Sequence, residues 1–163
     1  MGRTALLAAA VLYVLSVAVA AVLLPAEVPL HFGAGGSADR YGSRAEALTG
    51  FVLLGLLLLG LWLLVRRSLR RTSLADINVP HPEYWKTLEH EPELRRRVEA
   101  DLTGFYAATV LLLAAVPVSV LVAARGSGDL PGAFAALFGG YVVGSSVWCV
   151  LLVTRRFRPP SAS

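Results

Sequence analysis

The sequence contains a single cysteine, and four long stretches of it contain no charged side chain, although Lys, Arg, Asp and Glu make up 16% of its 163 residues. One cysteine, Cys149, excludes an intrachain disulfide, so the fold is not a small disulfide-stapled domain. The sequence also lacks the glycine-rich phosphate loop of P-loop proteins and the His-Glu-x-x-His motif of zinc proteases. We therefore expect no catalytic residues, no cofactor and no resident metal.

The stretches without charge run over residues 5–24, 48–65, 102–124 and 133–153. An α-helix rises about 1.5 Å per residue, so about 20 apolar residues cover the ~30 Å hydrocarbon core of a bilayer. The sequence therefore predicts one all-α integral membrane domain over residues 1–163, a four-helix transmembrane bundle surrounded by lipid. The connecting loops are residues 25–47 and 66–101.

Most of the 15 basic residues lie in loop 66–101 or after residue 153. The positive-inside rule then places both termini and this loop in the cytoplasm, and loop 25–47 outside. We interpret the Arg pairs beside the helices as topology anchors at anionic headgroups, and we expect no nucleic-acid binding. The expected location is a bacterial plasma membrane.

The first stretch permits two interpretations. Its apolar run ends near Ala18-Val19-Ala20, which resembles a signal-peptide cleavage site. However, the run is about 20 residues long, whereas the apolar region of a signal peptide has ~7–15. We expect a retained helix; cleavage would leave three spans in the same orientation.

The outward loop concentrates polar and aromatic side chains between turn-forming residues. Alternating apolar residues from Val28 to Phe32 are compatible with a short strand, and the glycines at 33–36 predict a tight turn. The candidate recognition residues are Glu27, His31, Phe32, Asp39, Arg40, Tyr41 and Arg44.

Three alternative interpretations of this loop stay open. The loop is a folded lid, with His31 bonded to a carboxylate and Asp39 capping a turn or paired with Arg40 or Arg44. It is a surface for an extracellular peptide or membrane-protein partner. Or Glu27, His31 and Asp39 bind a metal.

The cytoplasmic loop has its own candidate docking residues, which are Asn78, Pro80, Tyr84 and Trp85. Amphipathic Tyr and Trp rings favour the headgroup layer, where we expect both of these rings. Acidic residues around Pro92 predict a helix start that runs into the third span. Pro117 predicts a kink in that span.

The fourth span carries small residues at every fourth position, namely Gly132, Ala136, Gly140 and Gly144. Small residues let two helix backbones approach closely in a membrane. The ridge predicts either packing against another helix of the same chain or a homodimer interface.

The loop sequence resembles a known bacterial family. In the outward loop, the resemblance rests on Pro29-Leu30-His31-Phe32, Gly36 and Asp39-Arg40-Tyr41-Gly42-Ser43-Arg44. In the cytoplasmic loop, it rests on Asn78-Val79-Pro80 with Tyr84-Trp85. Over roughly residues 8–100 the chain is similar to the domain of unknown function 1648 family, whose domain also occurs in SdpI-type immunity and signalling proteins. The resemblance implies a multi-pass membrane protein without assigned catalysis.

No charged residue lies in the middle of a span, whereas ion-coupled carriers need charged relays there. We therefore expect a non-enzymatic membrane protein that senses, signals or confers immunity through its outward loop. The alternative is a structural or accessory subunit of a larger membrane complex or transporter.

Overall fold

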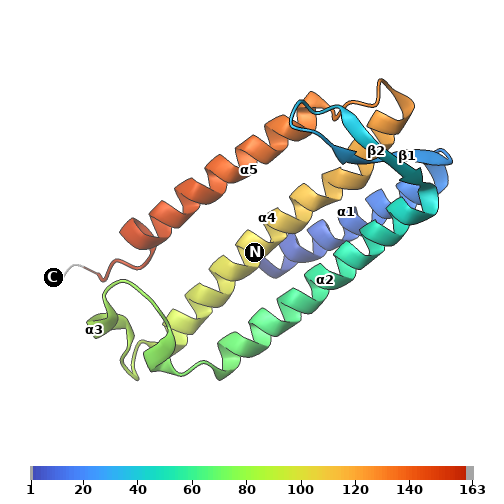
Figure 1. The fold of residues 1–163 in the computed structure, drawn as a ribbon. Helices are drawn as coiled ribbons and strands as arrows, with labels where there is room; N and C mark the ends of the chain where they lie inside the picture. The colour runs from blue at the N-terminus through green and yellow to red at the C-terminus, as the bar shows by residue number, and fades with distance from the viewer. Residues whose placement is uncertain (1, 161–163) are drawn as a thin grey trace.

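The computed structural model describes residues 2–160, and four long helices dominate this part of the chain (Figure 1). They are α1 (Gly2–Leu23), α2 (Arg44–Arg71), α4 (Glu91–Arg125) and α5 (Gly132–Leu151), the last continued by a π-helical turn, η2 (Leu152–Arg156). All four are long and apolar enough to cross a membrane. The predicted all-α fold with four membrane-spanning helices is confirmed.

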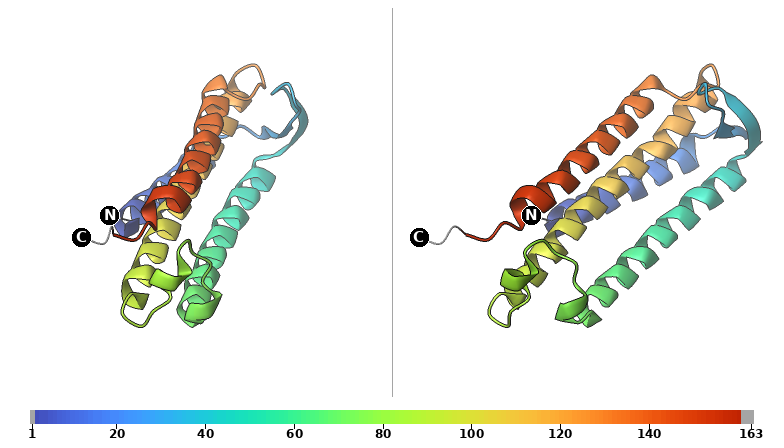
Figure 2. Two further views of the ribbon diagram at one scale, coloured as in Figure 1. Left: turned by 90° about the vertical axis from the view of Figure 1, so that its left-hand side faces the viewer. Right: turned by 60° about the vertical axis from the view of Figure 1, so that its left-hand side comes forward.

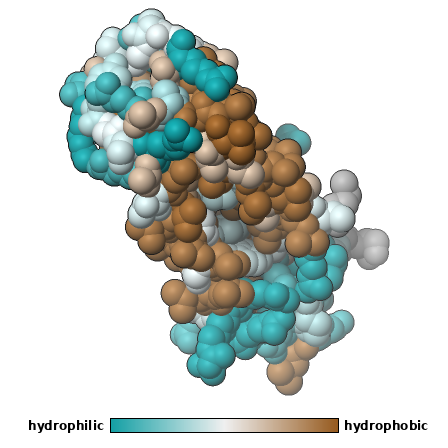
Figure 3. Space-filling model, turned by 90° about the vertical axis from the view of Figure 1, so that its right-hand side faces the viewer, coloured by the Kyte–Doolittle hydropathy of each residue, from teal (hydrophilic) through white to brown (hydrophobic). Residues whose placement is uncertain are grey.

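The two ends of the bundle differ. At the hairpin end, strands β1 (Glu27–Phe32) and β2 (Ala38–Ser43) form an antiparallel hairpin beside the α4–α5 turn. At the opposite end, here called the loop end, lie the 3₁₀ turn η1 (Leu74–Asp76) and the short helix α3 (Pro82–Trp85) (Figure 1). An apolar belt separates the two polar ends on the face shown in Figure 3.

Helices α1 and α4 form the most extensive helix–helix contact and make up the centre of the bundle. Helix α2 stands on one side of this pair and α5 on the other (Figure 2). No residue of α5 is buried, and its Tyr141 hydroxyl lies 2.7 Å from the Thr109 hydroxyl of α4. The two outer helices therefore present most of their apolar surface to the surroundings.

Local sequence explains where the helices begin. The Ser43 hydroxyl caps α2 by accepting a hydrogen bond of 3.1 Å from the Glu46 amide. Helix α4 starts at Glu91 with Pro92 in its first turn, as predicted, and runs unbroken through the fully buried Pro117. Because helical hydrogen bonding does not stop where charge begins, α2 and α4 extend well beyond the uncharged stretches.

A small core closes the loop end. It comprises Ile77, Val79, Trp85, Leu94 and Phe157. The Trp85 ring is 2% exposed, and its Nε1–H donates a hydrogen bond of 2.7 Å to the Phe157 carbonyl. The C-terminal segment covers the ring and accepts its hydrogen bond, so Trp85 packs inside the protein and does not expose its face to headgroups.

Candidate functional site

The hairpin has a defined backbone conformation that hydrogen bonds and close packing hold in place. Its turn closes with a hydrogen bond of 2.9 Å from the Gly36 amide to the Gly33 carbonyl, and Gly36 has φ +84°, a conformation that favours glycine. At Gly42 the backbone passes so close to the Leu30 and Glu46 side chains that a Cβ would overlap them. The predicted strand at 28–32 and the predicted turn at 33–36 are both confirmed.

A hydrogen bond and an ion pair organise the exposed face of the hairpin. His31 Nδ1 lies 2.6 Å from Asp39 Oδ1, and both side chains are more than half exposed. Arg40 on β2 pairs with Glu46 in the first turn of α2. The lid interpretation was correct that His31 bonds a carboxylate. Asp39 bonds this histidine and not Arg40 or Arg44, because a strand irregularity between the His31–Arg40 and Phe32–Ala38 pairs leaves Asp39 beside His31. Arg40 pairs with Glu46 instead.

The remaining recognition candidates do not gather into one cluster. Glu27 is exposed at the start of β1 and Arg44 at the start of α2, where the Arg44 amide donates to the Ala26 carbonyl at 3.0 Å. Tyr41 is 49% exposed and its hydroxyl sits so close to Gly128 that a Cβ there would lie 2.6 Å away. Within residues 2–160, no three His, Cys, Asp or Glu side chains converge as a metal site would require.

Backbone hydrogen bonds tie the hairpin to the α4–α5 turn. The Leu130 amide bonds the Gly36 carbonyl at 2.7 Å, and the Ala38 amide bonds the Gly128 carbonyl at 3.2 Å. The hairpin also packs against the helices, since Val28 is fully buried in an apolar cluster with residues of α1, α2 and α4. The hairpin is thus a roof attached to several helices and not a loose loop.

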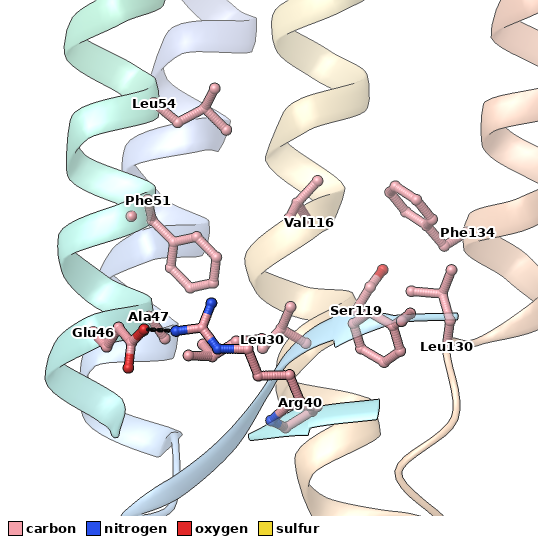
Figure 4. Close-up of a pocket in the computed structure, with 14 residues that line it drawn as sticks. Leu30, Arg40, Glu46, Ala47, Phe51, Leu54, Val116, Ser119, Leu130 and Phe134 are labelled. Carbon is pink, nitrogen blue, oxygen red and sulfur yellow. Dashed lines mark hydrogen bonds and ion pairs between the residues drawn. The ribbon is translucent and has the colours of Figure 1, made fainter. Parts of the chain in front are cut away.

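Beneath this roof lies a cleft of about 490 Å³ between α2, α4 and the start of α5 (Figure 4). Its lining residues include Leu30, Phe32, Phe51, Leu54, Val116, Val120, Leu130 and Phe134. Arg40 and Glu46 stand at its edge. Ser119 is 7% exposed, and its hydroxyl makes no hydrogen bond with any residue from 2 to 160. The cleft is therefore apolar, with three polar groups at fixed places.

Residues 7–56 match the model of a family described as a domain of unknown function (DUF1648). The chain contains this domain. The DUF1648 match spans most of α1, the hairpin and the first part of α2, and so includes Arg40, Glu46 and Phe51 of the cleft. The predicted second half of the resemblance, from Asn78 to Trp85, lies outside the match. No curated protein and no solved structure gave a significant match to the chain.

Sequence reasoning identified Phe32 and Arg40 of the cleft but missed most of its lining. Phe51, Leu54, Val116 and Phe134 are ordinary apolar residues of membrane helices, and nothing local distinguishes them. Ser119 was the one available signal, because it is a hydroxyl inside an apolar stretch.

The other predicted sites divide into exposed and buried residues. Asn78 is exposed and Pro80 is half-buried, whereas Tyr84 stacks on His90 with ring centroids 4.0 Å apart. Trp85 is buried and unavailable for docking. These residues therefore form a packed corner of the loop end, with Asn78 as its accessible member.

The small-residue ridge of α5 is not closely packed at its glycines. A Cβ added at Gly132, Gly140 or Gly144 would meet nothing within 4 Å, and Ala136 is exposed. Gly144 nevertheless lines a small hollow between α5 and α4, with Gly104 and Phe105 on its other side. Close packing of the ridge within the chain is therefore not seen at these glycines. The homodimer interface stays a prediction.

Proposed function

We propose that this chain is a non-enzymatic membrane protein that recognises an amphipathic ligand in the cleft beneath its hairpin. One observation carries the proposal: an apolar cleft of about 490 Å³ is lined by three helices and roofed by an anchored hairpin. Small-molecule sites typically have volumes of about 300–1,000 Å³ and apolar walls with a few placed polar groups. This cleft has that size and that distribution of polarity.

The lining defines the ligand class. An apolar tail would contact Phe51, Leu54 and Val116, while a polar head would reach the Arg40–Glu46 pair at the edge. The Ser119 hydroxyl offers one further hydrogen bond. A lipid-like molecule or a hydrophobic peptide from outside the cell has this chemistry, which fits a role in sensing, signalling or immunity.

Helix α2 provides a route from the cleft to the other side of the membrane. Its first turns line the cleft. At its other end, the carbonyls of Leu69 and of Thr72, which follows the helix, accept hydrogen bonds of 3.1 Å and 2.9 Å from Arg95. A ligand that moved the first turns of α2 would strain these bonds at the loop end. We therefore assign the output of the protein to the cytoplasmic loop.

Photolabelling with a palmitic acid that carries a diazirine tests the ligand class. The purified chain in lipid nanodiscs should be labelled at Leu54 and Val116. Gly50 lines the cleft, and a Cβ there would meet nothing within 4 Å, so Gly50→Trp fills the cleft without a backbone clash. Gly60→Trp on the same helix is the matched control, because Gly60 is equally open and lies outside the cleft.

We expect Gly50→Trp to abolish the labels at Leu54 and Val116 and Gly60→Trp to leave them. Equal labelling of both variants would contradict a ligand site in the cleft. So would labels spread evenly over outward-facing residues such as Leu56 and Leu57, which are 60% and 67% exposed.

A second candidate function is that of an accessory subunit in a larger membrane complex. The uncovered glycines of α5 favour it, since helix association in membranes uses such surfaces. Gly140→Leu should then abolish co-purification of a partner while the chain still inserts. Unchanged co-purification would remove this candidate.

A further inference from the structure

Two arginines at the loop end differ from the other arginines that pair with acids of α4. Arg95 pairs with Glu91 at 2.8 Å, Arg96 and Arg97 both pair with Glu93 at 2.7 Å, and Arg156 pairs with Asp101 at 3.2 Å. Each of these distances is within the range of an N–H···O hydrogen bond. The nearby carboxylates are therefore already engaged.

Arg3 of α1 and Arg66 of α2 share the one remaining acid, Glu99 of α4. Arg3 Nη2 lies 3.5 Å from Glu99 Oε1, and Arg66 Nε lies 3.8 Å from the same oxygen. Charge-assisted bonds of this kind are usually about 2.7–2.9 Å long. Two guanidinium groups thus face one carboxylate at long distances, which leaves an excess of positive charge between three helices.

The Arg66 side chain is incompletely satisfied. Its Nε–H is buried and has no hydrogen-bond partner, and it is the one such buried side-chain nitrogen or oxygen within residues 2–160. A buried donor without an acceptor is costly, and the cost is greater when the group is charged. The fold therefore holds the Arg66 guanidinium group with only a distant carboxylate, Glu99, and no acceptor within hydrogen-bond distance of its Nε–H.

The position of this group in the bilayer identifies the missing anion. Arg66 directly follows the uncharged stretch 48–65, Arg3 precedes stretch 5–24, and Glu99 precedes stretch 102–124. All three side chains therefore lie at the boundary between hydrocarbon and headgroups, where lipid phosphates are found. Arginine binds phosphate oxygens through its planar fork of N–H donors.

We propose that Arg3 and Arg66 form a phosphate-binding site between α1, α2 and α4 at the loop end. The phosphate oxygens accept hydrogen bonds from the accessible part of the Arg66 guanidinium, whose side chain is 36% exposed, and the exposed Arg3 side chain closes over the group. Glu99 keeps the two guanidinium groups in position and reduces their mutual repulsion. The site is independent of the cleft at the hairpin end.

Native mass spectrometry of the full chain in detergent tests the site with phosphatidylglycerol as the probe. Diacylglycerol, which has the tails but no phosphate, is the control lipid. Wild-type protein should retain one phosphatidylglycerol and no diacylglycerol. Arg66→Gln should weaken retention about tenfold or more, the change expected from losing one charged hydrogen bond.

Arg67→Gln is the matched control variant, because Arg67 is the exposed neighbour on the same helix and makes no ion pair within residues 2–160. It should retain the lipid as the wild type does. Arg66→Lys keeps the charge but loses the planar set of guanidinium N–H donors, so its retention of phosphatidylglycerol should lie between those of the wild type and Arg66→Gln. Thermal unfolding of each variant establishes that it is folded.

A further arm adds inorganic phosphate without lipid. A rise in melting temperature that requires Arg66 would show that the free anion occupies the site, whereas a response to phosphatidylglycerol alone would assign it to the headgroup. Both results support the proposal. Equal loss of lipid in Arg66→Gln and Arg67→Gln, or equal retention of diacylglycerol, would overturn it.

Discussion

The Tyr13 hydroxyl of α1 donates a hydrogen bond of 2.6 Å to the backbone carbonyl of Phe51 on α2. Phe51 lines the cleft, so this bond positions one cleft wall against the centre of the bundle. The Tyr106 hydroxyl of α4 bonds the Leu58 carbonyl of α2 in the same way. Tyr13 and Tyr106 thus fix the position of α2, which otherwise has few neighbours. Because α2 forms one wall of the cleft, these two hydrogen bonds also set the shape of the cleft.

Replacing Tyr13 with phenylalanine should loosen α2. The variant loses one buried hydrogen bond and little volume, so we expect a loss of about 1 kcal/mol in the free energy of unfolding. Denaturant unfolding in detergent micelles measures it. Tyr41→Phe is the control, because Tyr41 is half-exposed and makes no hydrogen bond through its hydroxyl within residues 2–160. Equal losses in both variants would contradict a specific role for the Tyr13 bond.

Two glycines of α2 should respond to alanine with opposite signs. A Cβ at Gly55 would lie 2.8 Å from Tyr13 Cε1, so Gly55→Ala must displace the Tyr13 ring. A Cβ at Gly60 would meet nothing within 4 Å, so Gly60→Ala gains helix propensity of about 1 kcal/mol without a clash. The same unfolding assay should show Gly55→Ala as destabilised and Gly60→Ala as neutral or stabilised. A stabilised Gly55→Ala would show that the Tyr13 ring does not need this space.

The helices were predictable because membrane insertion depends on a local property, the length of a stretch without charge. The start of α4 at Glu91 was predictable for a similar reason, since proline and acidic residues suit a first helical turn. Strand β1 and its turn followed from alternation and glycine content. Each of these features is encoded within a few neighbouring residues.

The cleft and the loop-end core were not predictable because distant residues form them. Phe51 and Val116 meet only after α2 and α4 are placed side by side. Trp85 is buried because Phe157, 72 residues away, covers it and accepts its hydrogen bond. An isolated Tyr-Trp pair is typical of the headgroup layer, and no local pattern shows which ring the C-terminal segment will cover.

The contact between the hairpin and the α4–α5 turn should weaken in acid. Hydrogen bonds from the Ser127 and Ser37 hydroxyls lower the pKa of the Asp129 carboxyl below its usual value. The folded state therefore favours the ionised form. This contribution to stability is complete above the unfolded-state pKa of about 3.9 and is lost as the pH falls through the lower folded-state value.

Thermal unfolding between pH 6 and pH 2.5 should therefore separate wild type from Asp129→Asn. Acid lowers the melting temperature of both through other carboxyls, but the wild type should lose more below about pH 4, because only it protonates at this position. Parallel curves for the two proteins would contradict a stabilising role for ionised Asp129.

The two polar ends should lie on opposite sides of the membrane, with the hairpin end outside. Single cysteines test this in a Cys149→Ala background, at Ala34 in the exposed hairpin turn and at Leu88, which is 88% exposed at the loop end. An impermeant maleimide added to intact cells should label Ala34→Cys at once and Leu88→Cys only after the membrane is opened. The charge asymmetry of the loops gives the expected direction. The reverse pattern would place the cleft inside the cell and contradict recognition of an outside ligand, whereas labelling of both residues from one side would contradict four membrane crossings.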